Sequence, residues 1–103
     1  MILTIDTSKQ EQTLVQLKSK DDKLVEEVRV ERKPGSQVLL PAIIKILKKH
    51  KLKPENLTKV EVNEGPGSYT GLRVGVSVAN TLGHFLGIPV NNKKNKTIEP
   101  KYT

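Results

Sequence analysis

The feature that most constrains this chain is a run of 17 residues, Val74 to Val90, without a lysine, arginine, aspartate or glutamate. The chain has 103 residues and is 28% charged, so a surface helix of this length would carry several charges. Apolar residues recur at helical spacing in two rows, Leu72, Val76, Ala79, Leu82 and Leu86, and Val74, Val78, Leu82 and Phe85. A helix that is apolar around most of its circumference is buried on more than one side. The chain's own sheet covers one side, so the other side predicts a partner.

Length and composition indicate one small domain. A chain of 103 residues forms a single core with little to spare. It has no cysteine, which excludes a disulfide framework and a thiolate metal site. The uncharged run is short and contains Ser77, Asn80 and His84, so it is too polar to cross a bilayer, and the N-terminal residues lack the pattern of a signal peptide. We therefore expect a cytoplasmic protein with no membrane contact.

Hydrophobic periodicity and turn residues predict an alternating order of strands and helices. The predicted elements are a strand at Met1–Asp6, a hairpin of Gln12–Lys20 and Lys23–Arg32, a helix from an N-cap at Ser36 to about His50, a strand at Lys59–Asn63, a helix from about Thr70 to Leu86 and a short strand at Ile88–Val90. This order is typical of an α/β fold, a single ribonuclease-H-like lobe with two main helices and a mixed five-stranded sheet of a β-hairpin plus a parallel core. Residues 1–90 form the predicted lobe, and residues 91–103 form a basic tail that we expect to be flexible.

The net charge of +7 is concentrated in two segments. Residues 45–59 carry six lysines against one glutamate, and residues 91–103 carry four lysines against one glutamate. Clustered lysines can meet nucleic-acid phosphates, which makes Lys48, Lys49, Lys51 and Lys53 candidate contacts to RNA. The alternative interpretation is that lysines at a helix end favour the helix dipole and keep the protein soluble. With three aromatic residues in the chain, no stacking platform for bases is evident.

A glycine-rich loop precedes the uncharged helix. A strand, a glycine loop and a helix N-terminus together favour anions, so Gly65, Gly67, Ser68 and Thr70 form a candidate anion or phosphate loop. The loop is not a Walker A motif, because Leu72 and Arg73 stand where lysine and a hydroxyl residue are required. The favoured interpretation is a tight turn in which Thr70 or Ser68 caps the helix.

Two carboxylates raise the alternative of a metal-dependent nuclease or an ATPase. Asp6 ends the first predicted strand and Glu64 ends the fourth, so both lie at one edge of the predicted sheet. A two-metal nuclease needs further carboxylates, and the first helix offers none between Ser36 and His50. The two histidines do not have ligand spacing either. We therefore predict no catalytic and no metal-binding residue, and we interpret Asp6 as a turn residue that ends its strand.

Three segments carry a resemblance to a known family. They are MILTIDTS at 1–8, LLPAIIKIL at 39–47 and EGPGSYTGLRVGVSVANTLGHFLGIPV at 64–90. Together they resemble the N-terminal lobe of the TsaB family, whose members take part in making threonylcarbamoyladenosine next to the tRNA anticodon. Two features differ: residues 33–37 read KPGSQ in place of the family's Arg-x-His-Ser-Glu-like segment, and no second lobe follows.

The resemblance implies a non-catalytic scaffold subunit. It implies a related TsaD-like catalytic subunit as the partner, bound through the helices of the lobe, and a TsaE-like ATPase that joins the pair. It also implies that ATP and metal are held by the partner subunits, so that this chain needs no cofactor, and that tRNA is met through the complex. The alternative is a self-associating regulatory or orphan single-lobe protein, a homodimer formed through the same helices.

Small residues in the uncharged helix suggest where the partner binds. Gly75, Ala79 and Gly83 recur every four residues and lie in one row, which lets another backbone approach closely. We assign this small row to a helix contact, either between subunits or with the predicted helix Ser36–His50 at its edge, and the large row of Val74, Val78, Leu82 and Phe85 to the chain's own sheet. The predicted partner interface consists of Tyr69, Arg73, Gly75, Val76, Ala79, Asn80 and Gly83.

Overall fold

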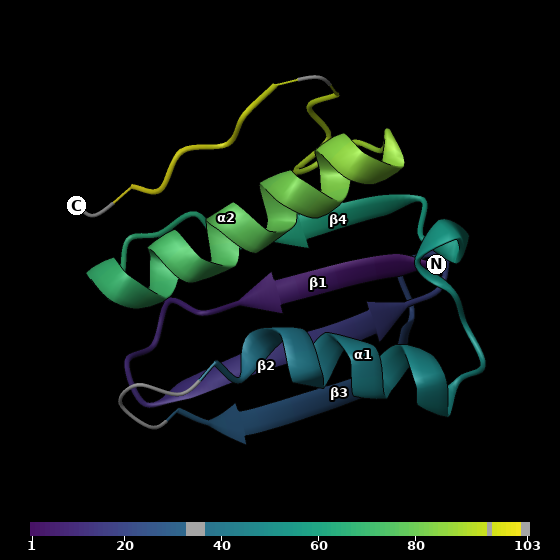
Figure 1. The fold of residues 1–103 in the computed structure, drawn as a ribbon, viewed down its shortest axis with the longest axis horizontal. Helices are drawn as coiled ribbons and strands as arrows, with labels where there is room; N and C mark the ends of the chain where they lie inside the picture. The colour runs from purple at the N-terminus through teal and green to yellow at the C-terminus, as the bar shows by residue number, and fades with distance from the viewer. Residues whose placement is uncertain (33–36, 95, 102–103) are drawn as a thin grey trace.

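The computed structural model describes residues 1–32, 37–94 and 96–101, and its core is a mixed four-stranded sheet (Figure 1). The elements are β1 (Ile2–Asp6), β2 (Gln12–Lys18), β3 (Leu24–Glu31), α1 (Leu39–Lys49), the 3₁₀ turn η1 (Pro54–Asn56), β4 (Lys59–Val62) and α2 (Tyr69–Leu86). The strand order is β3-β2-β1-β4. β1 is antiparallel to β2 and parallel to β4, and β2 and β3 form an antiparallel hairpin. The α/β class, the hairpin and the two main helices are confirmed.

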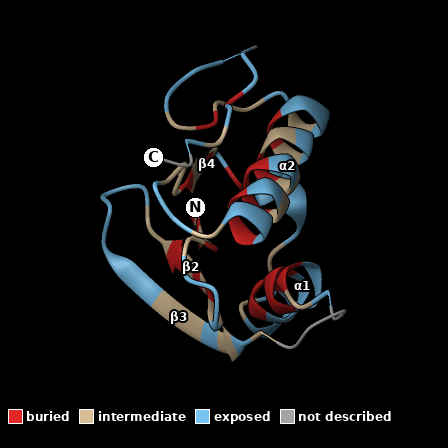
Figure 2. Ribbon diagram, turned by 90° about the vertical axis from the view of Figure 1, so that its left-hand side faces the viewer, coloured by how far each residue is buried: buried red, intermediate tan, exposed pale blue. Residues whose placement is uncertain are grey.

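Both helices pack on the same face of the sheet, α1 over β2 and β3 and α2 over β4 and β1 (Figures 1 and 2). The strand residues on that face are Leu3, Ile5, Val15, Leu17, Val60 and Val62, all buried. The residues between them point to the opposite face. There Thr4 Oγ1 donates to Glu61 Oε1 at 3.2 Å, and Gln16 Nε2 donates to Glu27 Oε1 at 2.7 Å. The sheet is therefore apolar toward the helices and polar on its other side.

The predicted fifth strand at Ile88–Val90 does not form. Val90 makes a single parallel bridge with Val60, and the chain then turns at Asn91, whose φ is +50°. The Asn91 side chain takes the place of a longer strand: its Oδ1 accepts from Val62 N at 2.8 Å and its Nδ2 donates to Val62 O at 3.0 Å. One amide therefore satisfies both backbone groups that a fifth strand would have paired, and the sheet ends with four strands.

The helix α1 begins later than its sequence suggests. The predicted N-cap, Ser36, lies outside the described residues, and the helix begins at Leu39 after Val38. Gln37 Oε1 accepts from Leu39 N at 3.1 Å, which satisfies one free donor of the first turn. Pro41 stands in that same turn, where its missing N–H breaks no helical bond. The buried residues of α1 are Leu39, Ala42, Ile43, Ile46 and Leu47.

The small residues of α2 are buried within the chain's own fold, so their predicted assignment to a helix contact is wrong, whereas Val74, Val78 and Leu82 of the large row are partly buried and pack against the core as predicted. Its buried residues are Gly71, Leu72, Gly75, Val76, Ala79 and Gly83. A Cβ added at Gly75 would overlap Thr7 Oγ1, and one added at Gly83 would overlap Val90 Cγ2. Phe85, assigned to the core, is 83% exposed. The close backbone approach is made to the chain's own sheet, because α2 lies directly on β4 and β1.

The described part of the tail differs from the expected flexible segment. Ile98 is buried, and its backbone pairs with the side chain of Asn80 on α2. The tail folds back because Ile98 is an aliphatic residue within a polar sequence and α2 offers it an apolar surface. Among the described residues, no helix has both the length and the apolar character needed to cross a membrane.

Candidate functional site

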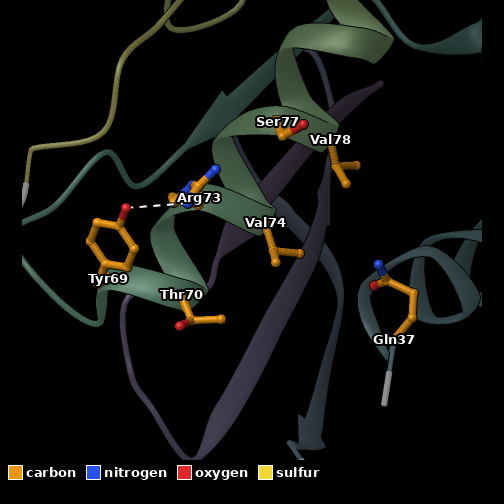
Figure 3. A pocket seen from close by; sticks show the side chains of 7 residues that line it. All are labelled: Gln37, Tyr69, Thr70, Arg73, Val74, Ser77 and Val78. Atoms are coloured by element: carbon orange, nitrogen blue, oxygen red, sulfur yellow. Dashed lines mark hydrogen bonds between the residues drawn. The ribbon is translucent and has the colours of Figure 1, made fainter. Parts of the chain in front are cut away.

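An open depression of about 410 Å³ lies beside the first half of α2, next to the segment that precedes α1. It is lined by Gln37, Tyr69, Thr70, Arg73, Val74, Ser77 and Val78. Figure 3 shows Val74 and Val78 pointing from α2 toward the side on which Gln37 and α1 lie. Arg73 and Tyr69 stand at one end, where Arg73 Nη1 donates to Tyr69 Oη at 3.2 Å and the guanidinium lies 5.4 Å from the ring centre. The depression therefore has an apolar wall and one cation held by an aromatic ring.

Large apolar side chains are exposed on the outside of both helices. On α1, Leu40 is 42% and Ile44 is 51% exposed, and on α2, Tyr69 is 57% and Phe85 is 83% exposed. Within the described residues, the other exposed large apolar side chains are Leu24 and Val25, at the start of β3. The helix layer therefore leaves apolar surface uncovered, which is typical of an interaction surface.

The structure divides the predicted partner interface into three groups. Tyr69 and Arg73 are exposed and line the depression. Gly75, Val76, Ala79 and Gly83 are buried against the chain's own sheet, so their assignment to a partner is wrong. Asn80 is half-buried and bonded to the tail. The sequence reasoning missed Leu40 and Ile44, although their spacing of four residues places them in one row of α1.

The cluster at the end of β1 is held together by Asp6. Its Oδ1 accepts from Ser8 N at 2.9 Å and from Ser8 Oγ at 2.6 Å, and its Oδ2 accepts from Asn63 Nδ2 at 3.3 Å. Burial by itself would raise the pKa of Asp6, but these hydrogen bonds together outweigh it and leave the pKa below its ordinary value. Asp6 therefore ends its strand and orders the turn that follows, as the sequence indicates.

The glycine-rich loop packs tightly against the same turn. Ser68 N donates to Ser8 O at 2.7 Å, and a Cβ on Gly67 would overlap Ser8. Ser68 Oγ accepts from Gly71 N at 3.3 Å, so Ser68 is the N-cap of α2. Thr70 lies inside the first turn and is exposed. The capping role predicted for this loop is confirmed at Ser68, and anion binding by Gly65, Gly67, Ser68 and Thr70 stays a prediction.

The basic segment lies at the end of α1. Lys48, Lys49, Lys51 and Lys53 are all exposed. Glu26 on β3 accepts from Lys49 Nζ at 3.0 Å and contacts His50 Nε2 at 2.6 Å. The hydrogen bond with His50, followed by that with Lys49, holds the pKa of Glu26 below its ordinary value. Lys49 is therefore engaged in attaching α1 to β3, and the other lysines remain available for an anionic ligand.

The second candidate carboxylate, Glu64, is also engaged. Its Oε2 accepts from Asn91 Nδ2 at 2.7 Å and its Oε1 lies 3.4 Å from Lys101 Nζ. The hydrogen bond from Asn91 and the nearby ammonium group outweigh the opposing effect of burial and lower the pKa of Glu64. In the part of the chain that the structure describes, no three histidine, aspartate or glutamate side chains are grouped so as to hold a metal ion.

The sequence and the fold are similar to those of known proteins. Residues 29–92 match the sequence model of the family described as TsaD, tRNA N6-adenosine threonylcarbamoyltransferase. The chain is 38% identical over 90 residues to the tRNA threonylcarbamoyladenosine biosynthesis protein TsaB of Bacillus subtilis, covering 87% of this chain and 39% of that protein. The TsaB protein of Buchnera aphidicola is 36% identical over 52 residues, which are 50% of this chain and 25% of that protein.

The fold is also that of a solved Pseudomonas aeruginosa protein, described as uncharacterised and similar to the peptidase YeaZ. The TM-score is 0.71 at 25% identity, and the match covers 86% of this chain and 40% of that chain. The match thus spans about two fifths of the Bacillus subtilis protein and of the solved Pseudomonas aeruginosa chain. Since the family model matches more than half of the chain, we conclude that the chain belongs to the family described as TsaD, and that its domain is TsaB-like.

Proposed function

We propose that this chain is a non-catalytic scaffold subunit in the biosynthesis of tRNA threonylcarbamoyladenosine in the cytoplasm. It binds a TsaD-like catalytic subunit through the solvent face of α1 and α2, and a TsaE-like ATPase joins the pair. ATP and metal are held by those partners. We further propose that the lobe is of the ribonuclease-H-like kind that two-lobed ATPases use twice. Support comes from the family match and from relatives named for this biosynthesis.

The observation that carries the proposal is the exposed apolar surface of the helix layer. In a chain with 28% charged residues, the run from Val74 to Val90 has none, yet Phe85 within it is 83% exposed. Exposed Leu40 and Ile44 extend this apolar character to α1. The opposite face of the sheet carries paired polar side chains instead. Most of the exposed large apolar side chains in the described residues lie on the helix layer, and such a concentration favours a protein partner on that side.

The two candidate catalytic carboxylates, Asp6 and Glu64, are both engaged in contacts within the chain, which is consistent with a scaffold. The oxygens of Asp6 accept hydrogen bonds from Ser8 and Asn63, and those of Glu64 contact Asn91 and Lys101. Each carboxylate therefore serves the local structure of its own loop. Chemistry in the proposed complex is assigned to the catalytic subunit.

Charge introduced into the helix face should weaken partner binding. We expect Ile44→Asp and Phe85→Asp each to lower the affinity for the TsaD-like protein of the same organism at least tenfold, about 1.4 kcal/mol, because the carboxylate would be buried in an apolar contact. The melting temperature should stay within a few degrees, since both side chains are exposed in the free chain. Isothermal titration calorimetry measures the affinity and differential scanning calorimetry the stability.

The matched control is Leu24→Asp, because Leu24 is 55% exposed on β3, away from the helix face. It should leave the affinity unchanged. Equal binding by all three variants would contradict the proposed face. The self-associating alternative makes a different prediction. The pure chain would be a dimer in sedimentation velocity, Phe85→Asp would dissociate that dimer, and the TsaD-like protein would not bind. This result would replace the scaffold proposal.

The lysines after α1 are proposed to contact tRNA phosphates in the complex. Lys48, Lys51 and Lys53 are exposed, whereas Lys49 is excluded from the test because Glu26 holds it. We expect the triple change of these three lysines to glutamate to weaken tRNA binding by the assembled complex, and the loss to shrink as salt rises, since phosphate contacts release counterions. A filter-binding salt titration measures both effects. The control is the same change at the exposed residues Lys20, Lys23 and Lys94. If both triple variants lose the same affinity for tRNA, the lysines after α1 make no specific contact and only keep the protein soluble.

A further inference from the structure

The segment Thr97–Lys101, which we call the strap, runs along α2 on the side away from α1 (Figure 1). Its path is extended, and Ile98 places its side chain in the core with an exposure of 3%. Thr97 and Glu99 on either side of Ile98 are exposed. The strap therefore contacts the body of the protein through alternate residues, as a bound extended peptide does.

Asn80 recognises the backbone of the strap. Asn80 Oδ1 accepts from Ile98 N at 2.9 Å, and Asn80 Nδ2 donates to Ile98 O at 2.8 Å. One amide side chain thus satisfies both backbone groups of the residue whose side chain is buried. Because Asn80 bonds only to backbone groups, it recognises any extended segment. The apolar surface beneath the strap selects the side chain.

A second anchor lies three residues further along. Lys101 N donates to Glu64 O at 2.6 Å, and Lys101 Nζ lies 3.4 Å from Glu64 Oε1. Pro100 precedes this anchor and restricts Glu99 to extended conformations. The two anchoring N–H groups belong to Ile98 and Lys101, so the proline, which has none, falls between them. The strap sequence is therefore pre-organised for the path that it takes.

The strap covers the body of the protein incompletely. A hollow of about 420 Å³ lies between it and α2, lined in part by Arg73, Ser77 and Thr81. A second hollow of about 230 Å³, lined in part by His84 and Val90, adjoins Thr97. The strap is thus held against α2 by one apolar side chain, that of Ile98, and a few hydrogen bonds. Contacts of this kind open locally at a low free energy.

The chain before the strap is fixed independently. Asn91 bonds to both backbone groups of Val62, so β4 stays covered whether or not the strap is in place. Release of the strap would therefore leave the sheet intact and uncover Asn80 and the surface around Val76 and Val90.

We propose that Asn80, Glu64 and the apolar surface around Val76 and Val90 form a recognition site for an extended segment with one aliphatic residue. The chain's own strap fills this site in cis, and the strap of a second copy fills it in trans when the resident one is displaced. The site adjoins the depression beside Tyr69, because Arg73 and Ser77 line both hollows, but it does not rest on the proposed function. Intramolecular tethering favours the cis form at ordinary protein concentrations.

The test uses the full chain and a synthetic peptide, KTIEPK, with the sequence of residues 96–101. In the Ile98→Ser variant the resident strap loses its anchor, so the peptide should bind at least tenfold more tightly than to the wild-type chain. An NMR titration monitors the side-chain NH₂ resonance of Asn80, which should shift on binding. Asn80→Ala added to Ile98→Ser should abolish binding, and the control peptide KTSEPK should not bind. Equal peptide affinity for the wild-type chain and Ile98→Ser would overturn the proposal.

Hydrogen exchange in the wild-type chain tests the same proposal if Ile98→Ser does not fold. The amides of Ile98 and Lys101 should exchange together and at least a hundredfold faster than those of Val60 and Val62. If instead the amides of Ile98 and Lys101 exchange only with global unfolding, the strap is an integral part of the core and the proposal is wrong.

Discussion

Replacing Gly75 with alanine should destabilise the fold by about 1–3 kcal/mol, although alanine is the better helix former. An added Cβ would overlap Thr7 Oγ1, and Thr7 is 1% exposed and donates from that oxygen to Gly71 O at 2.6 Å. Either α2 must move away from β1 or Thr7 must rotate and leave its hydrogen bond. Urea denaturation of both proteins measures the difference in the free energy of unfolding.

Ser77→Ala is the matched control, because Ser77 is exposed on the same helix. It should change the free energy of unfolding by less than about 0.5 kcal/mol. The double variant Thr7→Ala/Gly75→Ala should lose less than the sum of its single variants, since the two groups compete for one volume. Strict additivity, or a Gly75→Ala chain more stable than the wild type, would show that α2 does not approach β1 this closely.

Replacing Asn91 with alanine should cost about 2 kcal/mol or more, because it leaves both backbone groups of Val62 without a partner. Asn91 Nδ2 also donates to Glu64 Oε2 at 2.7 Å, so the change removes three hydrogen bonds at once. The loss should appear as a lower denaturation midpoint. Faster amide exchange at Val62 N, which donates to the asparagine, would locate the effect at the edge of β4.

Asn92→Ala separates the role of the side chain from the cost of the backbone. Asn91 and Asn92 both have a positive φ, +50° and +63°, so alanine at either position carries a similar backbone penalty of about 1–2 kcal/mol. Asn92 is exposed. The excess loss in Asn91→Ala is therefore the contribution of its three hydrogen bonds. Equal losses in the two variants would mean that water replaces the asparagine amide at no cost.

The sequence predicts most of the elements because their signals are local. Alternating apolar residues define β1 and the hairpin, and Ser68 before an apolar run marks the N-cap of α2. The faces of α2 could not be predicted in this way. A row of small residues indicates that some backbone lies close, but the spacing of Gly75, Ala79 and Gly83 is the same whether that backbone belongs to β1 or to a partner.

The site is predicted less completely than the fold. Tyr69 and Arg73 lie on the exposed helix face as expected, whereas the size and spacing of Phe85 predict a buried position and the residue is exposed. The prediction of a fifth strand at the edge of the sheet is wrong for another reason. Ile88–Val90 has the composition of a strand, and a side-chain amide at Asn91 replaces the pairing that would have extended it.

Because a single asparagine, Asn91, pairs the edge of β4, deamidation of that residue during storage would change the structure of the protein. The side-chain amide of asparagine is slowly hydrolysed in solution, taking up water and releasing ammonia, and the residue becomes aspartate. At position 91 this would convert the nitrogen that donates to Val62 O and to Glu64 into an oxygen that accepts only. Two carboxylates would then face each other where a 2.7 Å hydrogen bond now stands. An aged preparation would therefore contain a more acidic form whose sheet opens first at β4.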